Sequence, residues 1–148
     1  MTPLFAILDE LRDSPSVREE WLEHRLGVSV AERSTESTEY FRVLHGQQST
    51  QVPGISAVEL RVPIAQSATS GPMLVLHIDA SVRCVSLDEI QKHYGARPAL
   101  QVPTPRQPAS APIEYEYRFA WGRMSFGISR GTTECLTRVV VDYTKGNR

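Results

Sequence analysis

The chain has 148 residues, of which 41% are hydrophobic and 22% charged, values that predict one globular domain and exclude a chain disordered throughout. Its net charge is −1, from 17 acidic and 16 basic side chains. Because nucleic-acid binding needs an excess of basic side chains on one surface, no nucleic acid is expected among its partners.

Residues 1–27 predict two helices that pack as a helical hairpin. Thr2-Pro3 and Ser14-Pro15 are helix start signals, because each places a capping hydroxyl before a proline of the first helical turn. Apolar side chains follow each signal at helical spacing, and Gly27 is placed to end the second helix. Residues 1–40 also hold nine acidic side chains against four arginines, a net charge of −5.

Residues 28–85 predict strands. The first two can pair through the polar segment 34–38, and the third alternates apolar with charged side chains, as a half-buried strand does. The fourth is apolar enough for a central strand and can bend at 79–81. The predicted strand segments are residues 28–32, 39–45, 55–63 and 73–85.

Residues 86–95 predict a helix from a strong local signal. Ser86 and Glu89 form a capping box, in which each side chain accepts a hydrogen bond from the other residue's backbone amide. Val85 and Ile90 have the spacing of a hydrophobic staple, and Gly95 closes the helix.

Residues 96–113 predict an extended, proline-rich crossover. Five prolines prevent both a helix and a central strand here. A loop of this length inside a compact domain is often functional. The alternative is a stiff connection that only carries the chain from the helix to a distant strand.

Residues 114–143 predict a meander of three antiparallel strands joined by tight turns. In its first strand, aromatic and charged side chains alternate, which points the aromatic row into the core rather than toward stacked bases. The aromatic residues are Tyr115, Tyr117, Phe119 and Trp121, and the charged ones are Glu114, Glu116 and Arg118.

The predicted fold class is therefore a single α+β domain over residues 1–148. It combines the N-terminal helical hairpin with a mainly antiparallel sheet of about six to seven strands, and the capped helix over residues 87–94 precedes the C-terminal meander.

The sequence offers little support for catalysis. The pattern GxSxG occurs once, at Gly127-Ile-Ser-Arg-Gly131, but it lies at a turn between two strands of the predicted meander and not on the strand-to-helix turn that a hydrolase nucleophile occupies. No GxxxxGK[ST], GxGxxG or HExxH pattern occurs, so nucleotide, dinucleotide and zincin chemistry have no support. Cys84 and Cys135 lie in apolar segments without a CxxC motif and are expected to stay reduced and unreactive. We therefore predict a chain that is not an enzyme and has no cofactor.

His77 and Asp79 share one face of a predicted strand and could be two ligands of a metal ion. A third and a fourth ligand at suitable spacing are missing, so an exposed or hydrogen-bonded pair is expected and no metal is predicted. His24 and His93 are expected on helix surfaces, and His45 at the end of a strand.

The start of the chain lacks the basic region of a signal peptide. No apolar run approaches the roughly 18 residues of a membrane span. The sequence therefore predicts a cytoplasmic protein without a membrane partner.

One segment resembles the helix-and-meander unit of the BamE/SmpA and beta-lactamase-inhibitor-protein type. It consists of Val85-Ser-Leu-Asp-Glu-Ile-Gln-Lys-His-Tyr-Gly95, the crossover after it and the strands up to Tyr143. In that group, a capped helix that ends in glycine precedes an antiparallel sheet. The resemblance implies the same arrangement over residues 85–143.

In its size, its uneven charge and its lack of an export signal, the chain resembles a cytoplasmic immunity protein of a bacterial toxin–antidote pair. That resemblance implies a protein-binding module that inhibits a cognate toxin. The alternatives are an adaptor or structural subunit of another complex, or a small-molecule-binding or enzymatic α+β domain. A monomer or a homodimer is expected.

Three surfaces are candidates for contact with a protein partner. They are an acidic helical face, the proline-rich crossover and the charged face of the meander. A solvated helix surface explains the acidic residues equally well. The residues are Glu19, Glu20 and Glu23 on the helix, Arg97 and Arg106 in the crossover, and Glu114, Glu116 and Arg118 on the sheet.

Overall fold

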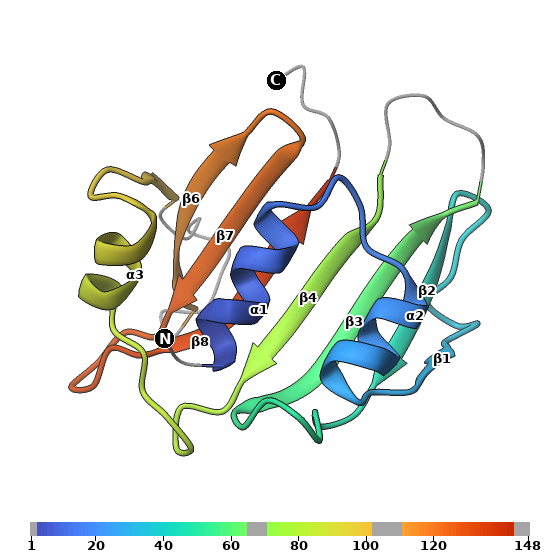
Figure 1. Cartoon of the computed structure of the whole chain (residues 1–148), viewed down its shortest axis with the longest axis horizontal. Helices are drawn as coiled ribbons and strands as arrows, with labels where there is room; N and C mark the ends of the chain where they lie inside the picture. The colour runs from blue at the N-terminus through green and yellow to red at the C-terminus, as the bar shows by residue number, and fades with distance from the viewer. Residues whose placement is uncertain (1–2, 65–70, 102–110, 144–148) are drawn as a thin grey trace.

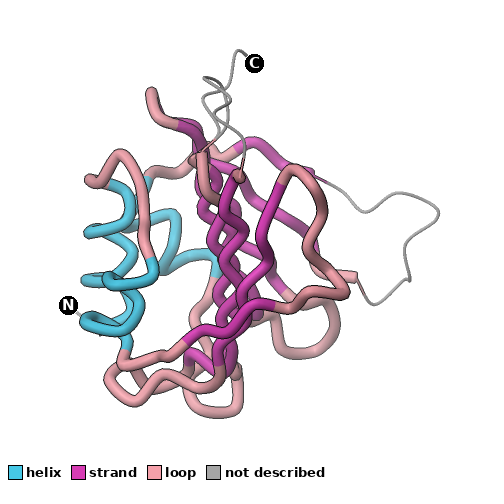
Figure 2. The backbone as a smooth tube through the Cα atoms, turned by 90° about the vertical axis from the view of Figure 1, so that its right-hand side faces the viewer, coloured by secondary structure: helices cyan, strands magenta, loops and turns pink. Residues whose placement is uncertain are grey.

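The computed structural model describes residues 3–64, 71–101 and 111–143. These residues form one antiparallel sheet with helices on one of its faces (Figures 1 and 2). The predicted α+β class with an antiparallel sheet is confirmed. Over the described ranges the sheet has eight strands, where about six to seven were predicted.

The order of the strands divides the sheet into two halves. Neighbouring strands follow the order β1-β2-β3-β4-β8-β7-β6-β5, so each half of the chain forms its own meander and the halves join at β4 and β8. The predicted C-terminal strands β6, β7 and β8 are consecutive antiparallel neighbours. The strands are β1 (Val30–Glu32), β2 (Phe41–Gly46), β3 (Ile55–Pro63), β4 (Met73–Ile78), β5 (Ala99–Gln101), β6 (Ile113–Phe119), β7 (Gly122–Ile128) and β8 (Leu136–Asp142).

The helices lie on one face of the sheet (Figure 2). The predicted N-terminal pair corresponds to α1 (Pro3–Arg12) and to α2 (Glu19–Trp21), which continues into the π-helical turn η1 (Leu22–Leu26). The start signal predicted at Ser14-Pro15 is wrong, because the Ser14 hydroxyl donates to the Ser16 carbonyl and the helix begins at Glu19. Arg25 of η1 forms an ion pair with Glu10 of α1, with 2.9 Å from Arg25 Nε to Glu10 Oε1. The third helix, α3 (Leu87–Tyr94), lies near β6 and β7 at the other end of the sheet (Figure 1).

The hydrophobic core fills the space between the helices and the sheet. Leucines and isoleucines of the helices, buried because they recur at helical spacing, meet the alternate apolar side chains of the central strands. The core includes Leu8, Leu11, Leu22, Leu26 and Ile90 of the helices and Leu44, Leu60, Leu74, Leu76, Met124, Phe126, Val139 and Val141 of the strands.

Aromatic side chains from the sheet side hold the C-terminal end of α1. The hydroxyl of Tyr143 donates to the Leu11 carbonyl at 2.8 Å, and Trp121 Nε1 donates to the Arg12 carbonyl at 2.7 Å. The last carbonyls of a helix have no partner within it, so these bonds satisfy them inside the core. The predicted inward direction of the aromatic row is confirmed, with Tyr117 buried and the other three packed against the core.

The predicted capping box of α3 is confirmed. The Ser86 hydroxyl accepts from the Glu89 amide at 3.2 Å, and the Glu89 carboxylate accepts from the Ser86 amide at 3.3 Å. Gly95 ends the helix with a positive φ of 121°, a conformation that other residues rarely adopt.

Two predictions for the middle of the chain need correction. The strand predicted over residues 73–85 stops at Ile78, because the Asp79 carboxylate accepts from the amide and the hydroxyl of Ser81 and turns the chain. The crossover after α3 contains the short edge strand β5, which was not predicted. An edge position suits this segment, since a proline-rich chain cannot supply a full ladder of donors.

The expectation of two reduced cysteines is wrong. Cys84 and Cys135 form a disulfide bond, with their Cα atoms 5.0 Å apart. The backbone brings them together, because the Leu136 amide donates to the Val85 carbonyl at 2.8 Å and so fixes the start of β8 beside the segment before α3.

None of the helices within the described ranges is both long enough and apolar enough to cross a membrane.

Candidate functional site

The sheet face opposite the helices carries the candidate site, and we call it the outer face. Side chains alternate between the two faces of a strand, so the registers of the strand pairs assign each residue to a face. Residues assigned to the outer face include Phe41, Val43, His45, Glu59, Arg61, Val75, His77, Glu114, Glu116, Arg118, Arg123, Ser125, Arg138, Val140 and Asp142.

A network of ion pairs crosses the outer face over β6, β7 and β8. The carboxylate of Glu116 lies 2.7 Å from Arg118 Nε and 3.1 Å from Arg123 Nη1, and Arg123 Nη2 lies 3.2 Å from Asp142 Oδ2. The side chain of Glu116 is completely buried. Its charge is compensated inside the protein, so Glu116 is a structural residue and not a free contact for a partner.

A second ion pair in this half of the sheet joins Glu114 to Arg138 across Gly127. Gly127 stands opposite Glu114 on one side and Arg138 on the other. A Cβ at this glycine would lie 3.2 Å from Glu114 Oε2, so a larger residue would press on the paired carboxylate. The absence of a side chain thus allows the two charged groups to meet.

The surfaces predicted to bind a partner lie on opposite sides of the sheet. Glu20 and Glu23 are exposed on the helix side, and Glu19 lies 4.0 Å from Arg42. The charged sheet residues Glu114, Glu116 and Arg118 lie on the outer face instead. One globular partner therefore cannot cover both sets at once. Arg97 is exposed in the loop after α3, and Arg106 falls outside the described residues.

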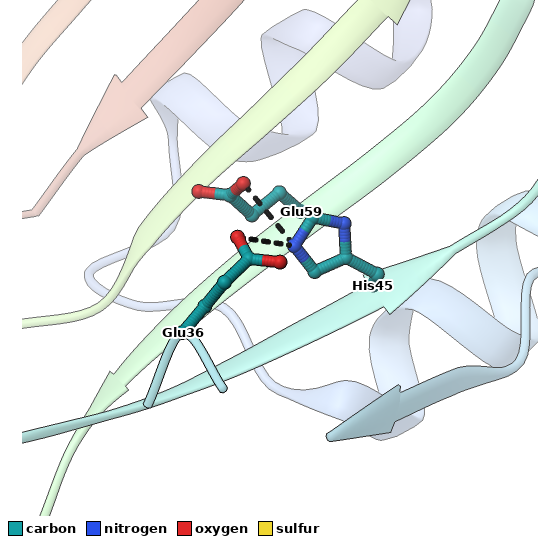
Figure 3. A group of neighbouring side chains, drawn as sticks. All are labelled: Glu36, His45 and Glu59. Carbon is teal, nitrogen blue, oxygen red and sulfur yellow. Dashed lines mark hydrogen bonds and ion pairs between the residues drawn. The ribbon is translucent and has the colours of Figure 1, made fainter. Parts of the chain in front are cut away.

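A cluster of Glu36, His45 and Glu59 occupies the other half of the outer face (Figure 3). His45 Nε2 lies 3.3 Å from Glu36 Oε1 and 3.4 Å from Glu59 Oε1. His45 and Glu59 stand directly opposite each other on β2 and β3, and Glu36 reaches them from the β1–β2 connection. This set offers one nitrogen and two oxygens at a single point, which can bind a cation.

Each carboxylate of this cluster also pairs with an arginine through its second oxygen. Arg61 Nε lies 2.8 Å from Glu59 Oε2, and Arg33 Nη1 lies 3.6 Å from Glu36 Oε2. The first oxygen of each carboxylate is thereby turned toward His45. The arginines orient the cluster in the way that outer hydrogen bonds orient the ligands of a metal.

An apolar corner lies at the end of the same two strands, formed by Tyr40, Phe41, Pro63 and Ile64. Phe41 stands opposite Pro63, and the Ile64 amide donates to the Tyr40 carbonyl at 2.8 Å. The exposed fractions are 62% for Tyr40, 37% for Phe41 and 51% for Ile64. Phe41 and its partner Pro63 share the outer side of these strands with His45.

The other candidates from the sequence do not form a site. His77 lies exposed on the outer face, whereas the carboxylate of Asp79 serves the turn after β4. The hydroxyl and the amide of Ser81 hold the pKa of Asp79 below its usual range. A hollow in the β2–β3 connection is lined by Gln48, Ser49, Thr50 and Pro53. Neither His77 nor Asp79 lines it.

Comparison with known proteins identifies no relative. No family model matches the chain. Neither the curated proteins nor the solved structures contain a significant match.

Proposed function

We propose that this chain is a non-catalytic protein-binding module that docks a protein partner on the apolar corner at the end of β2 and β3. One observation carries the proposal. Four large hydrophobic side chains are exposed within the described residues, and three of them, Tyr40, Phe41 and Ile64, gather at this corner. Clustered exposed hydrophobic residues mark interaction sites more often than single ones do.

The composition of the corner supports the same proposal. Tyrosine is enriched among the residues that dominate binding energy, and such anchors are usually surrounded by polar and charged side chains. Exposed Glu39, Arg42 and Arg61 lie beside the corner in sequence or on the paired strands. The partner should present an apolar patch with charges of both signs around it.

The class of partner that we propose is a bacterial toxin, which the chain would inhibit as an immunity protein does. The small size of the chain supports this choice. The net charge of −5 over residues 1–40 suits a basic partner, although the exposed Glu20 and Glu23 lie on the helix side.

The test is affinity capture of the full chain from its native cells, followed by mass spectrometry. A stoichiometric partner that is toxic when expressed alone, and harmless when expressed with this chain, would support inhibition of a toxin. A stoichiometric partner without toxicity would contradict that class and favour an adaptor subunit. Recovery of a small molecule with no protein partner would contradict the whole proposal.

Matched variants locate the surface. The double substitution Tyr40→Ser and Phe41→Ser should abolish capture, because it removes both aromatic anchors. Val82→Ser should leave capture unchanged, since Val82 is also exposed but lies near Gly54, beyond the opposite end of β3. Loss of capture in Glu20→Lys with Glu23→Lys, but not in the corner variant, would assign binding to the helix side instead.

The same native cells can be used to test the cellular compartment of the protein. The sequence predicts the cytoplasm, where thiols are normally kept reduced, whereas disulfide bonds persist in oxidising compartments. Alkylation of free thiols in freshly lysed native cells would distinguish the two. Protection of both Cys84 and Cys135 would support an oxidising compartment, and labelling of both would support the cytoplasm.

A further inference from the structure

We propose that Glu36, His45 and Glu59 form a binding site for a divalent transition metal, with Zn²⁺ as the best-fitting ion. The site is distinct from the proposed docking at the apolar corner and does not depend on it. It rests on three observations: the mutual distances of the donor atoms, the orientation of the two carboxylates and the anchoring of the turn that carries Glu36.

The two distances from His45 to the carboxylates match those between ligands of a tetrahedral ion. With bonds of about 2.1 Å to nitrogen and oxygen, two ligands of a tetrahedral Zn²⁺ lie about 3.4 Å apart. His45 Nε2 lies 3.3 Å from Glu36 Oε1 and 3.4 Å from Glu59 Oε1. All three donor atoms lie within 4.8 Å of one another, so small side-chain rotations would place one ion between them (Figure 3).

The two carboxylates are already turned toward the position of the ion. Arg61 pairs with Oε2 of Glu59, and Arg33 pairs with Oε2 of Glu36. Both arginines are about half exposed, at 47% and 52%, so solvent screens their repulsion of a cation. Each carboxylate therefore keeps one oxygen for the ion while the arginine fixes its orientation.

The third ligand comes from a turn that the backbone holds against β2. The Ser37 hydroxyl accepts from the Val43 amide at 3.0 Å, and the Arg33 amide donates to the Val43 carbonyl at 2.7 Å. These bonds place Glu36 beside His45 without any ion. A bound metal ion would cross-link the turn to the sheet, because Glu36 lies in the turn and His45 and Glu59 lie in strands.

The chemistry of the donor set selects the class of ion. Imidazole favours Zn²⁺ and its neighbours over Mg²⁺ or Ca²⁺, which prefer oxygen ligands alone. Three protein ligands leave one tetrahedral position, which water would fill because Glu36 is exposed to solvent.

The test is calorimetric titration of the metal-stripped, tag-free full chain with Zn²⁺ at neutral pH. One saturable site is expected, and His45→Gln should weaken binding by at least about tenfold, as loss of a ligand does. Glu36→Gln should have a similar effect. This variant should fold like the wild type, because Glu36 lies in an exposed turn. Saturating Zn²⁺ should also raise the melting temperature of the wild type by about 5 °C, but not that of His45→Gln.

His77→Gln is the matched control, because His77 is an exposed histidine on the same outer face. This variant should bind Zn²⁺ like the wild type. Substitution by Co²⁺ should give the intense visible bands of a tetrahedral ion in the wild type and in His77→Gln. Absence of saturable binding to the wild type would overturn the proposal, and so would equal affinity in the His45→Gln variant.

Discussion

At the scale of single residues, the hydroxyl of Tyr143 joins the sheet to the end of α1. Its bond to the Leu11 carbonyl is 2.8 Å long and buried. Tyr143→Phe removes this donor and leaves the carbonyl with a weaker contact, from the Ser14 amide at 3.4 Å. Stability should fall by about 1 kcal/mol, measured by urea unfolding at neutral pH. Tyr40→Phe is the control, because Tyr40 is 62% exposed and should cost little.

The same variant should behave differently at alkaline pH. Burial raises the pKa of Tyr143 above its usual range, so between pH 10 and that raised value the unfolded chain loses its phenolic proton first. Below about pH 10 both states keep the proton, and above it each pH unit costs the wild type about 1.4 kcal/mol at this residue. Tyr143→Phe escapes that loss, so the two stability curves should meet near about pH 11. Parallel curves up to that pH would contradict the burial of the phenol.

Alternation in the sequence predicts which face of the sheet a residue lies on, but it does not predict whether that residue is buried or paired. Glu114, Glu116 and Arg118 were predicted on the charged side of their strand, and the register places them on the outer face. That Glu116 is buried could not be predicted, because its burial depends on Arg123 from the next strand. The distinction matters, since a buried, compensated carboxylate stabilises the fold and offers little to a partner.

At the scale of elements, the start of α3 depends on its capping box. Ser86→Ala removes the hydroxyl that accepts from the Glu89 amide and frees the Glu89 carboxylate from its reciprocal bond. The expected cost is about 1 kcal/mol, measured by urea unfolding monitored by circular dichroism. Ser29→Ala is the comparison, because Ser29 is exposed and precedes β1 without capping a helix. Equal stability of the two variants would mean that the box contributes nothing.

Local signals predicted this helix because every contact of its cap lies within four residues. The His45 cluster is different, because it needs the register of β2 against β3 and the path of the β1–β2 connection. From the sequence, the segment of β2 is expected to pair with that of β1 alone, and His45 is expected at a strand end. Glu59 is fourteen positions from His45, and no spacing rule links them.

At the scale of the whole molecule, the sequence predicted strands but not the junction of the two halves. A C-terminal meander can add to either edge of a sheet, and nothing in Leu136–Asp142 specifies β4 as its neighbour. β4 and β8 are both apolar on the helix side, as central strands are. That pattern is consistent with many different orders of the strands in the sheet. The disulfide was missed for the same reason, since its two cysteines are 51 positions apart and meet only through the position of β8 in the sheet.

That disulfide should contribute strongly to global stability. It links positions separated by 51 residues, and the loop it closes contains α3, β5, β6 and β7. The chain-entropy estimate for a loop of this length is about 4 kcal/mol, because the bond restricts the unfolded chain. Cys84→Ala should therefore lower the free energy of unfolding by about that amount without a cavity, since Cys84 is exposed. Urea unfolding of the oxidised wild type and the variant measures the difference.

The reduced wild type is the internal control for this prediction. With reductant present, its unfolding curve should shift to that of Cys84→Ala, because both chains then lack the cross-link. The Val85–Leu136 backbone bond remains in both, so the native order of strands should persist, with unchanged circular dichroism. A reduced wild type as stable as the oxidised one would show that the backbone pairing alone fixes this junction and that the bond is a consequence of the fold.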